Sequence, residues 1–262
     1  MPVRPLFAAW MIVALGGVAS AGADDPALVQ KLKSAAKQYE QKKDAARGRA
    51  LKEFDNQIAH LKTDRRLTPA ARGDKVKEWT AARERFAETG RFPRDDQYAN
   101  VELQYYLAVD RGFRPLTKLI DDVIADGVRT GKKETEAAGL KLREDIEQQL
   151  PGAGRITAPS VWRGTYTRSG AVIPYELHIG KRGASTFAGR VEDNAGAAGN
   201  WAFNVEGQTS GLSVEFVLTR SIRGKFKYFK LRGIVCDDRL IGTTQTRPGG
   251  KVVGVVVLRR GK

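Results

Sequence analysis

Apolar residues in the first half of the chain recur at helical spacing. Between residues 26 and 61 the steps are mainly three, four and seven, through Leu28, Leu32, Ala35, Tyr39, Ala46, Leu51, Phe54, Ile58 and Leu61. Such steps place side chains on one face of a long helix. Thr68-Pro69 begins a second amphipathic stretch that Gly90 ends, and Pro115 is expected to break or kink a third. A last stretch finishes at Leu150.

The connections between these stretches are short, which favours antiparallel neighbours. We therefore expect a helical hairpin or bundle, with its apolar faces packed within the chain. The alternative is that an exposed stripe pairs with a second copy, giving a homo-oligomer through the helices.

In the second half the period changes to two. Ile173, Tyr175, Leu177 and Ile179 alternate with Glu176 and His178, and similar alternation follows Trp201 and Leu212. About eight such segments lie between Val161 and Arg259, separated by glycine-rich or aspartate-rich turns. The pattern predicts a small antiparallel β-barrel, with a β-sandwich as the alternative. The predicted fold class is therefore α+β in two parts, a helical hairpin or bundle followed by an all-β barrel.

Large side chains crowd the predicted barrel interior. The inward set is Trp162, Tyr166, Tyr175, Leu177, Phe187, Trp201, Phe203, Phe216, Phe229 and Leu231. Eight strands enclose a space that side chains can fill or that holds one small ligand. The aromatic content favours a filled interior, and a ligand cavity is the alternative.

Composition shifts divide the chain. Residues 1–23 combine Arg4, an apolar run and small residues at Ala19-Ser20-Ala21, which is typical of a secretory signal peptide. An uncleaved anchor is the alternative, but the run is shorter than a membrane span. We expect the helical part at 24–150, a Pro/Gly linker at 151–159 and the barrel at 160–262. The mature protein is then exported, periplasmic or extracellular, without a transmembrane span.

The net charge of +15 is concentrated in the barrel half. Residues 24–158 hold 27 Lys/Arg and 23 Asp/Glu, a balance of +4, whereas residues 159–262 hold 17 and 7, a balance of +10. A field of this sign favours acidic partners. The single cysteine, Cys236, excludes an intramolecular disulfide and is expected to be a buried strand residue.

One segment gathers the basic residues with aromatic ones. We call residues 220–232 the basic strip; its candidate polyanion-binding residues are Arg220, Arg223, Lys225, Phe226, Lys227, Tyr228, Lys230 and Arg232. Cations neutralise phosphate or sulfate, and aromatic rings stack on bases or sugars. An exported chain would meet an anionic glycan, an envelope surface or extracellular nucleic acid. The alternative is a solvated hairpin whose lysines protect a strand edge.

The pattern contains no catalytic, metal or cofactor motif. His60 and His178 are the only histidines; His178 shares the outer face of its strand with Glu176, but neither histidine belongs to a cluster of cysteines or carboxylates at ligand spacing in the sequence. No nucleophile elbow or phosphate-binding glycine loop occurs. We therefore expect a protein that is not an enzyme and needs no cofactor.

Trp162-Arg163-Gly164-Thr165-Tyr166 opens the barrel, and together with the strand count it resembles the calycin barrels, both avidin-like and lipocalin-like. Lipocalins place glycine two residues before tryptophan, whereas here Trp162 precedes Gly164, so no ligand residue is transferred. The whole layout also resembles secreted proteins of planctomycete-type bacteria, which implies no activity. The resulting expectation is an exported binding or scaffolding protein with a basic barrel head. The alternative is a calycin-like carrier of a small apolar ligand.

Overall fold

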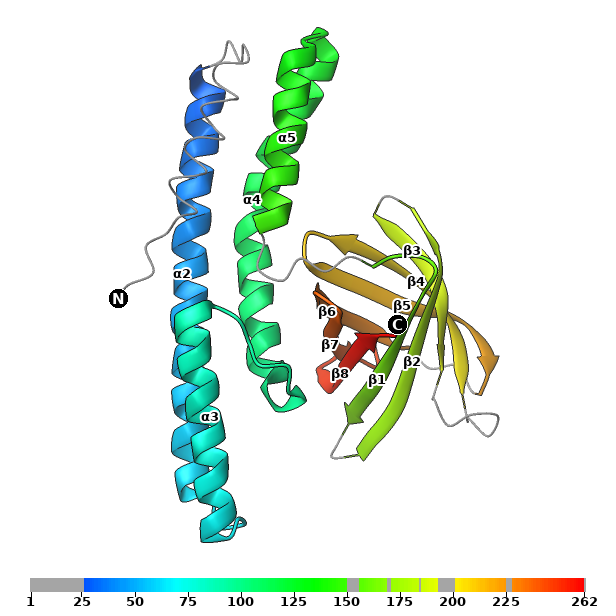
Figure 1. The fold of residues 1–262 in the computed structure, drawn as a ribbon. Coiled ribbons are helices and arrows are strands. Elements are labelled where there is room, and N and C mark those ends of the chain that lie inside the picture. Colours follow the sequence, from blue (N-terminus) through cyan, green and yellow to red (C-terminus); the bar gives the residue numbers. More distant parts are fainter. Residues whose placement is uncertain are drawn as a thin grey trace. The chain divides into compact units, whose positions relative to one another are not determined.

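The computed structural model describes residues 26–149, 156–168, 171–183, 185–192, 201–224 and 228–261. The predicted signal peptide and residues 151–155 of the predicted linker lie outside these ranges. Within them, four α-helices precede eight strands (Figure 1). The helices are α2 (Pro26–Thr63), α3 (Pro69–Thr89), α4 (Ala99–Thr130) and α5 (Lys133–Gln149), with a short 3-10 helix η1 (Asp96–Tyr98) before α4. No helix in the described ranges is both long and apolar enough to cross a membrane.

The predicted ends of α3 are confirmed by its caps. The hydroxyl of Thr68 accepts a hydrogen bond from the Ala71 amide at 3.3 Å, and Pro69 occupies the first turn. Gly90 ends the helix in the left-handed conformation, with φ 69°.

The break expected at Pro115 does not occur. Helix α4 runs through it from Ala99 to Thr130. A proline inside a helix removes one backbone hydrogen bond, and its ring crowds the carbonyl four residues earlier. Phe113, Leu116 and Ile120, on either side of Pro115, are buried, and we attribute the continuity of the helix to this packed face.

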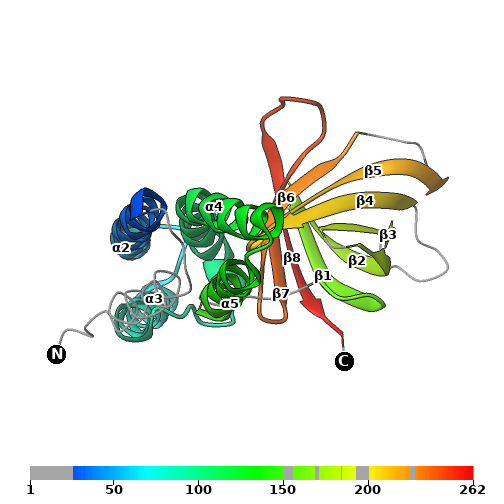
Figure 2. The same cartoon turned by 90° about the horizontal axis from the view of Figure 1, so that it is seen from above.

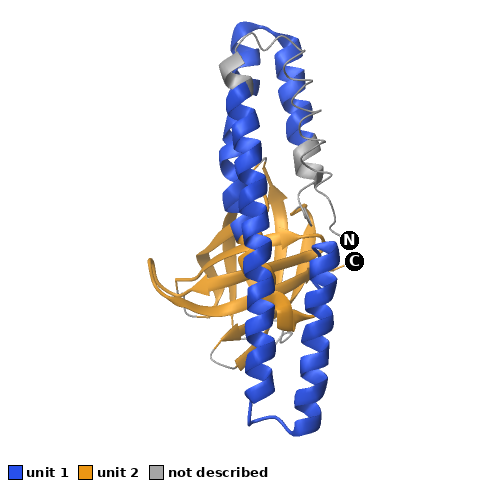
Figure 3. Cartoon of the chain, turned by 90° about the vertical axis from the view of Figure 1, so that its left-hand side faces the viewer, with its two compact units in different colours: residues 1–94, 108–150 blue, residues 95–107, 151–262 orange. Residues whose placement is uncertain are grey.

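Two compact units divide the described chain (Figure 3). Unit 1 comprises residues 1–94 and 108–150, and unit 2 comprises residues 95–107 and 151–262. Helix α4 thus contributes its first turns to the barrel unit and the rest to the helical unit.

Unit 1 is a helical bundle whose members lie side by side (Figure 2). Phe54 of α2 packs against Trp79 and Phe86 of α3, with ring centroids 5.7 and 5.9 Å apart. Tyr39 of α2 meets Phe113 of α4 at 5.6 Å. Tyr39 and Phe54 are among the apolar positions that predicted the first helix, and the intrachain packing of these rings agrees with the bundle expectation.

Unit 2 is built on a closed antiparallel barrel in which every strand pairs with its neighbours in sequence. The strands are β1 (Ser160–Arg168), β2 (Ala171–Arg182), β3 (Thr186–Glu192), β4 (Ala202–Ser210), β5 (Ser213–Arg223), β6 (Lys230–Cys236), β7 (Arg239–Gln245) and β8 (Val252–Arg260). Strand β1 pairs with both β2 and β8, which closes the ring. The predicted fold class is confirmed, and the β-sandwich alternative is wrong.

Glycine permits the close strand contact that closure requires. A Cβ atom on Gly164 of β1 would lie 2.0 Å from the carbonyl oxygen of Val257 in β8. No side chain fits there, so Gly164 lets the two strands coil past each other.

The ten residues predicted to face inward all belong to the barrel core, eight of them buried and Trp201 and Phe229 half-buried. Trp162 is fully buried, and its indole N–H donates to the hydroxyl of Ser160 at 3.1 Å. Ile156, just before β1, is also buried in this core. The half of the barrel around Trp162 is therefore filled, as the aromatic content favoured.

Candidate functional site

A cavity of about 330 Å³ lies at one end of the barrel. We call it the barrel-end cavity; it is lined by Tyr166, Arg168, Ile173, Tyr175, Trp201, Phe203, Leu218, Gly224, Tyr228, Phe229 and Thr246. These residues come from the ends of β1 and β5, the starts of β2 and β4, and the positions before β6 and after β7. In an up-and-down barrel these positions meet at the same rim. The interior is therefore filled around Trp162 and hollow at this rim.

Aromatic rings form most of the cavity wall. Tyr175 lies 5.5 Å from Trp201 and 6.2 Å from Phe229 between ring centroids, and Trp201 stacks on Phe203 at 5.8 Å. The rings pack against one another across three different chain segments, and all four line the cavity. A wall of this kind suits a flat apolar group.

One polar atom in this wall has no partner. Tyr175 is only 1% exposed, and its buried hydroxyl makes no hydrogen bond. Burial raises the pKa of Tyr175 well above its usual value, so the hydroxyl stays protonated and can donate. The neighbouring Tyr166 hydroxyl, by contrast, accepts a hydrogen bond from Thr244 at 3.4 Å. An unpaired buried hydroxyl is costly unless a ligand satisfies it.

The rim of the cavity carries polar and charged side chains. Arg168, at the end of β1, is exposed, and Thr246, after β7, is half-buried. An arginine at the mouth of an apolar pocket can bind a carboxylate or sulfonate while the ligand body stays inside.

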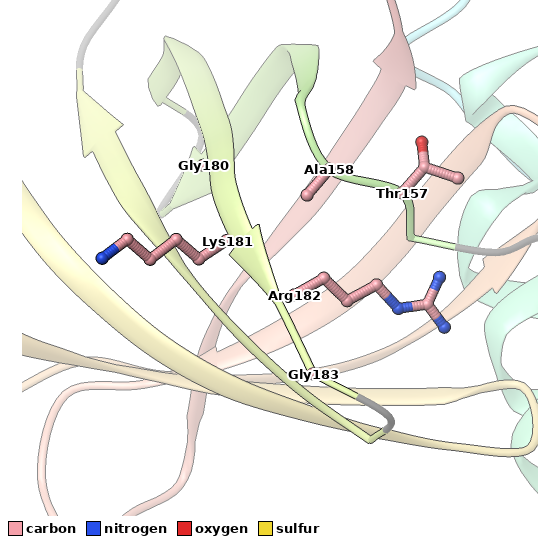
Figure 4. Close-up of a pocket in the computed structure, with 6 residues that line it drawn as sticks. All are labelled: Thr157, Ala158, Gly180, Lys181, Arg182 and Gly183. Carbon is pink, nitrogen blue, oxygen red and sulfur yellow. The ribbon is translucent and has the colours of Figure 1, made fainter.

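A second depression, larger but wide open, lies near the start of β1. Thr157, Ala158 and residues 180–183 line it. The side chains of Lys181 and Arg182 point away from each other (Figure 4). Arg182 donates to the carbonyl of Ile156, so this basic group already binds the chain itself. Diverging cations in an open groove do not make a binding site for one small molecule.

The structure divides the basic strip. Lys225, Phe226 and Lys227 lie outside the described residues. Tyr228 and the adjacent Phe229 line the barrel-end cavity, and Arg220 and Arg223 are exposed on β5. A surface on which basic and aromatic groups alternate stays a prediction.

The other two basic residues of the strip are bound to an acid. Lys230 lies 2.5 Å from one carboxylate oxygen of Glu215, and Arg232 donates to the other at 2.6 Å. Burial acts to raise the pKa of Glu215, but these two hydrogen bonds outweigh it, and the pKa is lowered. Glu215 therefore stays ionised and neutralises part of the charge that a polyanion would require.

Three potential metal ligands gather elsewhere on the barrel, a grouping that the sequence did not reveal. Glu176 and His178 of β2 lie beside Glu192 of β3, with the ligand atoms all within 4.8 Å of one another. We call these three the carboxylate–histidine cluster. Glu192 comes from the next strand, and the strand register that brings it opposite Glu176 cannot be read from a spacing motif.

Cys236 is buried, as expected. Burial raises the pKa of its thiol well above the usual value, and nearby Glu102 and Asp237 act in the same direction. A protonated, buried thiol is a poor nucleophile.

No protein-family model and no curated protein matches the chain. One similar solved structure is that of a bradavidin2–biotin complex, at 17% identity and a TM-score of 0.28. The similarity covers 41% of this chain and 100% of that one. Because this likeness is weak, neither a ligand nor a site residue is transferred from that protein.

Proposed function

We propose that the barrel binds a small, mainly apolar ligand carrying one acidic group, held in the barrel-end cavity. The observation that carries this proposal is the unpaired hydroxyl of Tyr175 in the wall of a 330 Å³ cavity. Cavities of roughly 300 Å³ and above, apolar with a few polar groups, are typical of small-molecule sites. The function is binding or carriage, since the lining offers no nucleophile with a base beside it.

The proposed pose follows from the lining. The flat body of the ligand lies among Trp201, Phe203 and Phe229. An acceptor atom of the ligand accepts a hydrogen bond from the Tyr175 hydroxyl, and the acidic group of the ligand pairs with Arg168. The pose also accounts for Tyr228 and Phe229 of the basic strip, because these aromatic residues face the cavity. Export of the protein, self-association through the helices and a polyanion partner stay separate predictions.

The test uses 1-anilinonaphthalene-8-sulfonate, a flat apolar probe with one sulfonate, added to the purified full chain. Its fluorescence should rise saturably, with one site per chain. Leu218→Trp adds a large ring to the cavity wall and should abolish the signal. Val235→Leu enlarges a side chain of the core that does not line the cavity, and should leave it unchanged.

A second pair of variants tests whether the positive charge at the cavity rim contributes to binding. Arg168→Gln should weaken probe binding about fivefold at low salt, the loss of one exposed ion pair of about 1 kcal/mol. Arg247→Gln removes an exposed arginine that does not line the cavity and should have no effect. The proposal fails if the wild-type signal does not saturate, or if the correctly folded Leu218→Trp variant binds the probe as the wild type does.

A further inference from the structure

The carboxylate–histidine cluster lies on the outer face of the barrel, apart from the cavity. In β2, Tyr175, Leu177 and Ile179 are buried in the core, so Glu176 and His178 between them face outward. In β3, Val191 is buried in the core and Glu192 faces outward beside it. The register pairs Glu176 directly with Glu192 and His178 with Arg190.

Two carboxylates directly opposite each other on one face of a sheet repel unless a positive charge lies between them. Glu176 is 6% exposed, which is unusual for an acidic residue on an outer face. Arg163 and Arg190 supply part of this positive charge, and a cation beside His178 would supply more.

The two distances from His178 match the ligand spacing of a small metal ion, and the two carboxylate oxygens lie within 4.8 Å of each other. The Nε2 atom of His178 lies 3.3 Å from Oε1 of Glu176 and 3.4 Å from Oε1 of Glu192. Zinc bound at 2.0–2.2 Å to tetrahedral ligands sets those ligands about 3.3–3.6 Å apart. Although this nitrogen is buried and has two acceptors within reach, it makes no hydrogen bond.

Two arginines border the cluster and leave ligand atoms available. Arg163 lies 2.9 Å from Oε1 of Glu176, and Arg190 pairs with Oε2 of Glu192. The Oε1 atom of Glu192 and the Nε2 atom of His178 are not bonded to either arginine. Arg163 would compete with a metal ion for Oε1 of Glu176, because it already pairs with that oxygen.

We propose that Glu176, His178 and Glu192 bind a divalent transition-metal ion of the zinc type. A nitrogen ligand with two carboxylates suits zinc better than magnesium or calcium, which prefer oxygen ligands alone. Three protein ligands leave a fourth position on the ion for water or another ligand.

Equilibrium dialysis of the purified full chain against ZnCl₂, after removal of metals with a chelator, tests the proposal. One zinc ion should bind per chain. His178→Gln and Glu192→Gln should each weaken binding by at least about 10- to 100-fold, the loss typical when only a hydrogen-bond partner of a ligand is removed, since each removes a direct ligand. His60→Gln removes the only other histidine, on α2, and should leave binding unchanged.

Arg163→Gln distinguishes a metal site from an ion-pair network. It should tighten zinc binding several-fold, because it removes a competing cation and keeps all three ligands. In ¹⁵N NMR spectra of the two histidines, zinc should shift the His178 imidazole and not that of His60. The proposal is overturned if the correctly folded wild type binds no zinc beyond the His178→Gln background. It is also overturned if Arg163→Gln weakens binding or if only His60 responds, which would leave the cluster as a network of ion pairs.

Discussion

Arg239 of β7 donates a hydrogen bond to Glu102 of α4 at 2.7 Å, and both side chains are 5% exposed. Asp96 accepts a second, longer bond from the same guanidinium at 3.3 Å. Residues 95–107 and the barrel belong to one compact unit, and this pair joins the first turns of α4 to a barrel strand within it.

Removing one member of the pair leaves the other buried without its counter-ion. Arg239→Met should therefore lower the free energy of unfolding by about 3–5 kcal/mol, measured by urea denaturation. The control is Arg259→Met, because Arg259 binds Asp96 at 2.9 Å while its side chain is 52% exposed. Its cost should stay within about 1 kcal/mol. Equal costs for the two variants would show that the Arg239–Glu102 pair is solvated.

The same pair makes stability depend on pH. Burial raises the pKa of Glu102 from 4.5 to about 7, against the opposing effect of Arg239. Between pH 4.5 and 7 the folded protein binds more protons than the unfolded chain does. The protonated Glu102 carboxyl therefore stabilises the folded state fully below pH 4.5. This stabilisation is lost as the pH rises through 7.

Urea denaturation across pH 4.5–8 should show this loss, amounting to a few kcal/mol at most. Glu102→Gln should flatten the profile in this range. Glu206→Gln, at an exposed position in β4, should retain the wild-type slope. A wild-type profile that rises with pH and is unaffected by Glu102→Gln would contradict the assignment.

Much of the architecture could be predicted from the sequence because it depends on local patterns. The change of apolar period from helical spacing to two separated helices from strands, and Thr68-Pro69 and Gly90 marked the ends of α3. The expected break at Pro115 was wrong, since proline chemistry is local while the packing beside it is tertiary; the alternative, a kink, stays a prediction.

The sites were harder to predict because they depend on which strand ends meet. Tyr175 and Trp201 were both assigned inward, but only the closed topology shows that they face one cavity. Glu192 is a single acidic residue in the sequence, and it becomes a neighbour of His178 only through the β2–β3 register. In the sequence, the cavity was indicated by the aromatic residues that lie near the ends of several predicted strands.

Two glycine-to-alanine variants test whether β1 and β8 pair closely enough to close the barrel. Gly164→Ala should destabilise the protein by at least about 2 kcal/mol, because its Cβ would overlap the Val257 carbonyl. Gly48→Ala, on α2 where nothing lies within 4 Å of the added carbon, should stabilise it by about 0.5–1 kcal/mol. Thermal denaturation followed by circular dichroism measures both. A tolerated Gly164→Ala would mean that β1 and β8 are not closely paired.

Tyr175→Phe tests the unpaired hydroxyl in the absence of ligand. Since the hydroxyl has no partner, its removal should leave the free energy of unfolding unchanged or raise it by up to about 1 kcal/mol. Tyr166→Phe removes one of two acceptors that lie 3.4 Å from the Thr244 hydroxyl, the other being the Gly254 carbonyl, and should cost about 0.5–1 kcal/mol. If urea denaturation gives the larger cost for Tyr175→Phe, the hydroxyl is already satisfied within the protein.

The most direct measurement is a crystal structure of the protein grown with 1-anilinonaphthalene-8-sulfonate. Density for the ring system should lie among Trp201, Phe203 and Phe229, with the sulfonate, which carries the probe's acceptor oxygens, at ion-pair distance from Arg168. Density for the probe only on the outer surface, with side chains filling the barrel end, would contradict the binding function.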